Sequence, residues 1–206
     1  MNDFKEWINP KNLSENNTCE FKKTYERARP FKHLLIKDFL KENKANLLLK
    51  ELKGEKFIEK EADLFNFKQT DDLYFTKNKV LKKFNNDFLS WDYFNFMTGI
   101  TGKKFKGTLD MAGTLYESTS FLLPHDDELE GRKIAYIIYL AKNFSEKDGG
   151  NFILYNSKSK EPTIIAKKYP PLFNSLLMFE VSEISFHEVE ENMSKKNRYA
   201  LGGWLH

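Results

Sequence analysis

Residues 121–140, FLLPHDDELEGRKIAYIIYL, contain two apolar runs separated by a polar segment with one glycine. The first run leads into His-Asp-Asp, and the second is rich in Ile and Tyr. Short apolar runs of this kind, bounded by turn-forming residues, are typical of β-strands in a buried sheet. We therefore expect two strands here, with His125 at the end of the first.

The same pattern continues through the second half of the chain. Segments that favour turns lie at 148–150, 156–157, 170–171 and 194–197, and they contain Gly, Pro, Asn and Ser. Short strands at this spacing, with no helical pattern between them, indicate an all-β sandwich or jelly roll. Besides the run that ends at 123, the predicted strands are 109–115, 133–140, 151–155, 163–166, 176–181, 186–189 and 198–205.

The first 108 residues have a more helical pattern. Residues 39–52 and 80–97 carry apolar residues at helical spacing, and a break near Ser90 divides the second segment into two predicted helices. Residues 19–29 are also compatible with a helix, and 31–36 with a short strand. We expect these helices to cover one side of the sandwich.

Composition limits the classes of function. The net charge is only +3 over 206 residues, without the dense basic stripe that strong nucleic-acid binding requires. The lone Cys19 excludes an internal disulfide. No apolar run approaches the roughly 20 residues that span a bilayer, and the N-terminus has no apolar signal core. We expect no membrane partner and a cytoplasmic location, or a nuclear one if the source is eukaryotic.

Four residues form a pattern with chemical meaning. His125 and Asp127 make a His-x-Asp, His187 follows 60 residues after Asp127, and Arg198 follows 11 residues later. Two imidazoles and one carboxylate are the facial triad of non-haem iron(II) oxygenases, and they leave metal positions free for 2-oxoglutarate and O₂. A bidentate guanidinium suits the far carboxylate of 2-oxoglutarate, and Arg is rare in this Lys-rich chain.

Each of these residues also has an ordinary structural interpretation. His125 could lie in a surface turn, His187 could be a core histidine with satisfied hydrogen bonds, and Arg198 could be a surface charge. Their common order on strands of one sandwich favours the site. His33 and His206 have no such partners, and we predict that they are structural or incidental.

The segment 121–140 resembles the metal-binding strand pair of the ribosomal prolyl hydroxylases, 2-oxoglutarate oxygenases that hydroxylate a proline of the small-subunit protein uS12. The resemblance extends over most of the chain, and its HDDELEGR segment is far more specific than a bare His-x-Asp. It continues at 29–33, 62–73, 149–151, 177–187 and 198–206.

This resemblance implies an α+β protein with a double-stranded β-helix (jelly-roll) fold and supporting N-terminal helices. It implies that His125, Asp127 and His187 are the catalytic metal ligands for Fe(II). Arg198 would bind 2-oxoglutarate, with O₂ as the other co-substrate and ascorbate as a reductant. It also implies Tyr139 and Tyr116 around the 2-oxoglutarate, and Trp204 near the substrate; for these three aromatic residues, ordinary core packing is the alternative.

We expect one oxygenase domain over residues 1–206, with helical support and a substrate flap in 1–108 and the jelly-roll core in 109–206. The resemblance implies that the flap is 63–72, although the polar run 68–72 also fits a plain surface loop. Longer eukaryotic members of that family continue into a second, catalytically degenerate copy of the fold. We expect no such copy after His206.

The preferred function is therefore hydroxylation of a prolyl residue in uS12. One alternative is a 2-oxoglutarate oxygenase that acts on another protein or on a small molecule. An alternative of a different class is a non-catalytic jelly-roll module used for binding. Such modules commonly lose a metal ligand or the anion-binding Arg, whereas this sequence retains all four residues.

Overall fold

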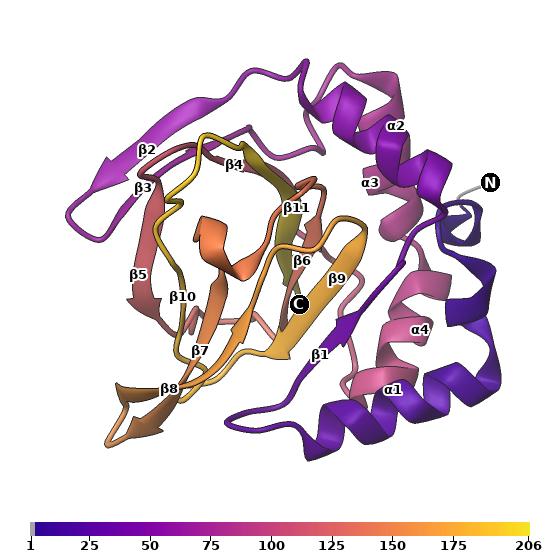
Figure 1. The fold of residues 1–206 in the computed structure, drawn as a ribbon. Coiled ribbons are helices and arrows are strands. Elements are labelled where there is room, and N and C mark those ends of the chain that lie inside the picture. The colour runs from indigo at the N-terminus through magenta and orange to yellow at the C-terminus, as the bar shows by residue number, and fades with distance from the viewer. Residues whose placement is uncertain (1–2) are drawn as a thin grey trace.

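The computed structural model describes residues 3–206, and its centre is one curled antiparallel sheet (Figure 1). The strand order is β1-β9-β6-β11-β4-β3-β5-β10-β7-β8, with β2 paired to β3. The predicted jelly roll is confirmed. The strands are β1 His33–Ile36, β2 Ile58–Ala62, β3 Phe65–Gln69, β4 Ala112–Tyr116, β5 Phe121–His125, β6 Ile134–Tyr139, β7 Phe152–Lys158, β8 Glu161–Tyr169, β9 Ser175–Glu180, β10 His187–Val189 and β11 Arg198–Leu205.

Four helices pack on one side of this sheet (Figure 1). The predicted break near Ser90 is confirmed, because the Ser90 hydroxyl accepts a hydrogen bond from the Tyr93 N–H and so caps the second helix of the pair. The helices are α1 Glu15–Arg27, α2 Glu42–Leu52, α3 Lys79–Phe88 and α4 Trp91–Thr101. No helix among residues 3–206 combines the length and the apolar character that crossing a bilayer requires.

Strand β6 separates two apolar clusters. Ile134, Tyr136 and Ile138 pack in the cluster shared with the helices, whereas Ala135 and Tyr139 belong to the cluster inside the curl of the sheet. Successive side chains of a strand point to opposite faces, so a strand buried on both faces must be apolar throughout. This explains why the run IAYIIY shows no alternation with polar residues.

The segment 63–72 contains a strand that was not expected from the sequence. Strand β3 lies within it and pairs with both β4 and β5. Phe65 and Phe67 alternate there with Asn66 and Lys68, which is the two-residue period of a strand. The polar run 68–72 obscured this alternation. The first half of the chain therefore supplies strands β1 to β3 as well as helices.

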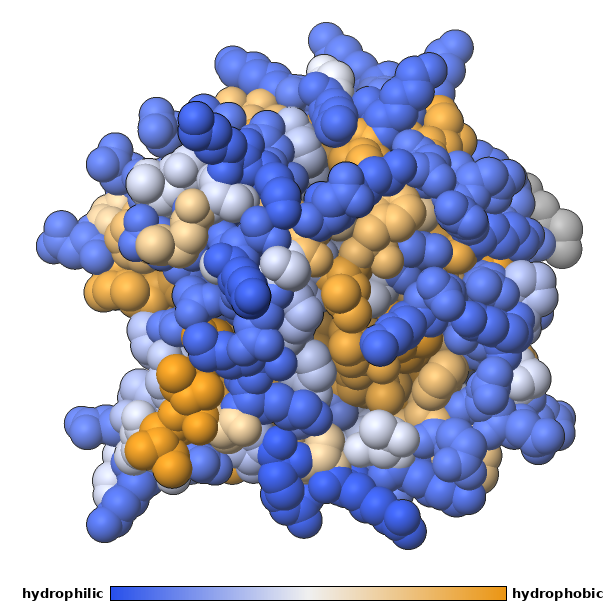
Figure 2. Space-filling model, viewed as in Figure 1, coloured by the Kyte–Doolittle hydropathy of each residue, from blue (hydrophilic) through white to orange (hydrophobic). Residues whose placement is uncertain are grey.

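The surface of the face shown in Figure 2 is mostly hydrophilic. An apolar patch at the lower left of that view lies over the β7–β8 hairpin, and Ile164 and Ile165 in the middle of β8 are exposed. The other exposed side chains of β8 include Lys167, as expected for an edge strand that charged residues protect from pairing.

Gly203 in β11 allows a close approach of two backbone segments. A Cβ atom at this position would lie 2.0 Å from the carbonyl oxygen of Asp110, which cannot move without shifting its own segment. We expect Gly203→Ala to lower the free energy of unfolding by about 1–3 kcal/mol, measured by urea denaturation.

The control is Gly99→Ala. At this position inside α4 the atom nearest to the added Cβ is 3.6 Å away, so the free energy of unfolding should rise by about 0.5–1 kcal/mol. Equal stability of Gly203→Ala and the parent would show that the Asp110 segment moves freely.

Candidate metal centre

The pairing of β5 with β10 brings two imidazoles together. His125 ends β5, His187 begins β10, and the two residues are direct partners in the strand register. Their ring centroids are 4.2 Å apart. Because cross-strand partners on one face lie close together, this register sets the separation of the two imidazoles.

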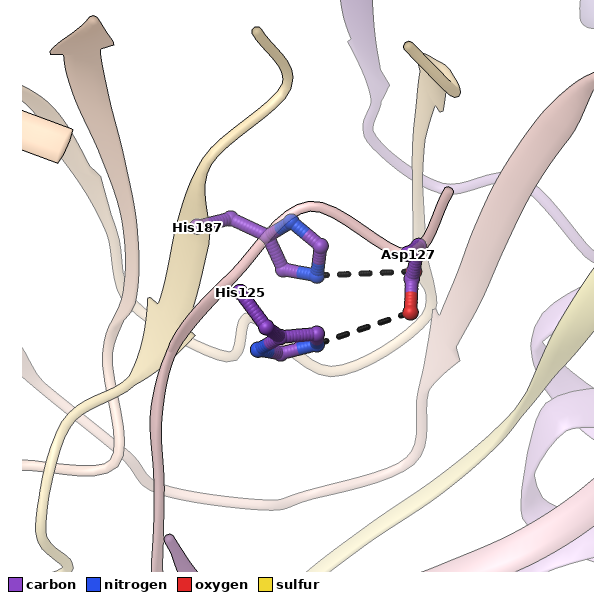
Figure 3. A group of neighbouring side chains, drawn as sticks. All are labelled: His125, Asp127 and His187. Atoms are coloured by element: carbon purple, nitrogen blue, oxygen red, sulfur yellow. Dashed lines mark ion pairs between the residues drawn. The ribbon is translucent and has the colours of Figure 1, made fainter. Parts of the chain in front are cut away.

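Asp127 completes the group from the loop after β5 (Figure 3). Its Oδ1 lies 3.5 Å from the Nε2 of His125, and its Oδ2 lies 3.5 Å from the Nε2 of His187. The three potential ligand atoms all lie within 4.8 Å of one another. The structure thus brings together the three residues that the sequence predicts as ligands.

The hydrogen bonds behind the imidazoles orient their lone pairs. The Nδ1 of His125 lies 2.9 Å from the carbonyl oxygen of Leu123, and the Nδ1 of His187 lies 2.8 Å from that of Ser185. A carbonyl oxygen can only accept, so each Nδ1 carries the hydrogen. In the neutral ring, Nε2 then has the free lone pair, and on both residues this atom faces Asp127.

The protonation states also suit a metal ion. Burial lowers the pKa of His187 to about 4, and the charge of His125 acts in the same direction, so His187 is neutral at pH 7. Burial alone would raise the pKa of Asp127, but the hydrogen bond from protonated His125 outweighs burial and lowers it to about 2. Burial alone would lower the pKa of His125, but the hydrogen bond with Asp127 raises it, so a metal ion competes with a proton at this imidazole. Imidazole nitrogens and one carboxylate are donors that suit iron(II).

The group lies on the wall of a cavity of about 360 Å³ inside the curled sheet. Phe152 and Phe179 line the same cavity and pack against the ring of His187. Arg198, Tyr116 and Trp204 also line it, but Tyr139 does not. A mostly apolar pocket with a few convergent polar groups is typical of a small-molecule site.

Arg198 is the first residue of β11 and is 1% exposed. Its Nε and Nη2 have no hydrogen-bond partner among residues 3–206. Its guanidinium carbon lies 4.8 Å from the ring centre of Tyr116 and 5.1 Å from that of Tyr139. A buried guanidinium with two nitrogens that lack an acceptor is unfavourable, so the cavity is suited to an anion at this end.

The two tyrosines beside Arg198 are buried and retain their phenolic hydrogens. Burial raises the pKa of Tyr139 to about 12, and it also raises the pKa of Tyr116. The hydroxyl of Tyr139 has no hydrogen-bond partner in the part of the chain that the structure describes. The hydroxyl of Tyr139 is therefore available as a donor next to the guanidinium.

Trp204 lies on the wall of the cavity, where it contacts Asp127. Its indole N–H donates a hydrogen bond to the Oδ2 of Asp127, with an N–O distance of 3.1 Å. The sequence reasoning missed Arg132, whose guanidinium carbon is 3.4 Å from the ring centre of Trp204. Arg132 is one of only four Arg in the chain and lies five residues after Asp127, and these two facts were the available signal.

The two other histidines lie outside this group. His33 is buried, with its Nδ1 2.8 Å from the carbonyl oxygen of Phe31 and its Nε2 2.8 Å from the hydroxyl of Tyr169. The Nε2 of His206 lies 2.9 Å from the Oδ2 of Asp110. Asp110 lines the cavity, so His206 contacts the wall of the site without being part of the triad.

The chain is similar in sequence to several known proteins. Residues 111–206 match the model of the 2OG-Fe(II) oxygenase superfamily. The chain is 39% identical over 183 residues to a prolyl 3-hydroxylase OGFOD1 of Xenopus laevis, with coverage of 86% of this chain and 35% of that protein. It is 33% identical over 195 residues to a prolyl 3,4-dihydroxylase OGFOD1 of Ostreococcus tauri, with coverage of 86% and 38%. The chain thus spans just over a third of the length of these relatives.

Solved structures share the fold at low sequence identity. A prolyl hydroxylase from Trichoplax adhaerens, in complex with a peptide of hypoxia-inducible factor, has a TM-score of 0.72 at 18% identity, with coverage of 93% of this chain and 90% of that one. A prolyl-4-hydroxylase from Pseudomonas putida has a TM-score of 0.69 at 15% identity, with coverage of 90% and 98%.

Proposed function

Because residues 111–206 match the model of the 2OG-Fe(II) oxygenase superfamily, we propose that the chain is an iron(II)- and 2-oxoglutarate-dependent oxygenase that hydroxylates a prolyl residue of a protein. The names of its relatives support a prolyl substrate, because the proteins at 39% and 33% identity are both prolyl hydroxylases. Our preferred substrate is the ribosomal protein uS12. A cytoplasmic location, or a nuclear one in a eukaryotic cell, suits such a substrate.

In this proposal His125, Asp127 and His187 hold the iron. When bound, iron(II) supplies the activation of O₂ that is coupled to oxidative decarboxylation of 2-oxoglutarate. The two Nε2 lone pairs and the carboxylate face one another, and the hydrogen bonds to Nδ1 keep the rings in that orientation. Because His187 is neutral at pH 7, no proton has to leave it before a metal binds.

Arg198 binds the far carboxylate of 2-oxoglutarate, and Tyr139 and Tyr116 lie beside it. The guanidinium and the phenolic hydroxyls are hydrogen-bond donors on buried side chains, and charge-assisted hydrogen bonds to a carboxylate are strong. Phe152 and Phe179 give the cavity apolar walls beside His187. Arg198, Tyr139 and Tyr116 bind and orient the co-substrate; they do not take part in proton transfer.

The observation that carries this proposal is the position of the unpartnered Arg198 on the same cavity as the triad. A site for a metal alone would not need a buried guanidinium without an acceptor. A dicarboxylic acid that binds the metal at one end would provide that acceptor at its other end.

The test is mass spectrometry of a uS12 peptide that contains the target proline. We expect the iron-loaded protein, with 2-oxoglutarate, O₂ and ascorbate, to add the mass of one oxygen atom to the peptide and to form succinate. A control peptide with alanine in place of that proline should remain unmodified.

Two outcomes would contradict parts of the proposal. Succinate formation without peptide modification, together with modification of a different substrate, would support the related oxygenase and reject uS12. No 2-oxoglutarate turnover under any condition, with the anion-binding site intact, would support a binding module instead.

A further inference from the structure

Asp127 has a backbone conformation that the surrounding protein must hold in place. Its φ is +65°, in the left-handed region that non-glycine residues rarely adopt. It lies in a loop, in contrast to His125 and His187, which are fixed by strand pairing. The carboxylate therefore needs contacts of its own to stay directed at the two imidazoles.

Trp204 provides one of these contacts from a rigid element. Its backbone is paired with Ala135 of β6, and its carbonyl oxygen accepts a hydrogen bond from the N–H of Asp110. From this fixed position the indole N–H donates to the Oδ2 of Asp127. A donor on a strand limits the rotation of the carboxylate better than one on a mobile loop.

Arg132 supports both partners of that hydrogen bond. Its guanidinium stacks on the indole of Trp204, with its carbon 3.4 Å from the ring centre. Its Nη1 donates to the backbone carbonyl oxygen of Asp127 at 3.4 Å and lies 3.9 Å from the Oδ1 of that residue. Arg132 thus contacts the backbone of Asp127, its carboxylate and the ring that binds the carboxylate.

We propose that Trp204 and Arg132 are positioning residues that fix the carboxylate of Asp127 in the orientation required to bind the metal. This inference rests on the proposed function, since it takes Asp127 as a ligand of the iron. It gives Trp204 a role different from the substrate contact that the family resemblance implies. The indole N–H and one face of the ring are already engaged by the protein, at Asp127 and Arg132.

The affinity for Mn(II) tests this role without any turnover. Mn(II) binds carboxylate and imidazole ligands and is stable in air, and free Mn(II) is measured directly by electron paramagnetic resonance. Trp204→Phe keeps an aromatic ring for Arg132 but removes the N–H donor. We expect its Mn(II) affinity to fall about 10- to 100-fold, the usual effect of removing a hydrogen-bond partner of a metal ligand.

Two further variants separate this role from general structural damage. Trp91→Phe changes an exposed tryptophan of α4 and should keep the parent affinity. Arg132→Gln removes the stacking on Trp204 and should lower the affinity about 2- to 5-fold. The melting temperature of the metal-free Trp204→Phe protein should remain close to that of the parent.

The outcomes distinguish this inference from the proposed function. If His187→Ala lowers Mn(II) affinity but Trp204→Phe changes it less than twofold, the metal site stands and the role of Trp204 is rejected. An unchanged affinity of Arg132→Gln would reject the role of Arg132. If His187→Ala leaves the affinity unchanged, the metal site itself is wrong and the inference fails with it.

Discussion

Replacement of His187 by alanine is expected to abolish 2-oxoglutarate turnover, with a decrease of more than about 100-fold in the rate of succinate formation. Loss of a hydrogen-bond partner behind a metal ligand typically decreases affinity or activity about 10- to 100-fold, so loss of a ligand should exceed that range. His187 is 3% exposed and its Nε2 lies 3.5 Å from the Oδ2 of Asp127, so its replacement removes one of the three donors from the centre of the site. The measurement is succinate formation by iron-loaded protein.

His33→Gln is the matched control for this variant. His33 is also a buried histidine, but both of its nitrogens contact Phe31 and Tyr169, away from the triad. Its replacement can lower the melting temperature and should leave the rate per folded molecule unchanged. Full succinate production by His187→Ala, together with a parent-like circular dichroism spectrum, would refute the assignment of His187 as a ligand.

Replacement of Arg198 by methionine is expected to raise the KM for 2-oxoglutarate about 30-fold or more. Loss of one partner of a buried, hydrogen-bonded charge pair decreases affinity by at least about 2 kcal/mol, which corresponds to this factor. Methionine fills a similar volume, so the cavity should keep its shape. The measurement is the dependence of succinate formation on 2-oxoglutarate concentration.

The stability of the ligand-free protein gives this prediction a second readout. Nε and Nη2 of Arg198 lack partners among the described residues 3–206, so their replacement removes an unfavourable buried charge. We expect the melting temperature of ligand-free Arg198→Met to equal or exceed that of the parent. Arg27→Met, at the end of α1, is the control for loss of a positive charge and should not change the KM. An unchanged KM of Arg198→Met would contradict the role of Arg198.

Much of the fold could be predicted because its signals are local. Apolar runs bounded by turn residues located the strands of the second half, and Ser90 marked the start of α4. The two imidazoles and Asp127 were predicted jointly, because the chemistry of the iron site requires a small and specific set of donors.

The remaining features depend on contacts that local patterns do not encode. Strand β3 was not predicted, because its sequence runs into a polar segment and shows only a short alternation. Its pairing with β4 and β5, which holds it in the sheet, cannot be seen in the local sequence. The hydrogen bond from Trp204 to Asp127 joins residues 77 positions apart. The sequence does not show that these two residues are in contact. It could therefore not distinguish a position of Trp204 beside the metal ligand Asp127 from a position beside the substrate.

The position of β6 between two apolar clusters has a consequence for the effects of substitutions in the helices. Tyr136 faces the helices, and its neighbour three positions along the strand, Tyr139, lies beside Arg198 inside the curl. Substitutions among the helices can affect the cavity through this strand, because Ala135, Tyr136 and Ile137 of β6 line the cavity. Sequence changes in the helical layer that leave the position of β6 unchanged should therefore leave the lining of the cavity unchanged.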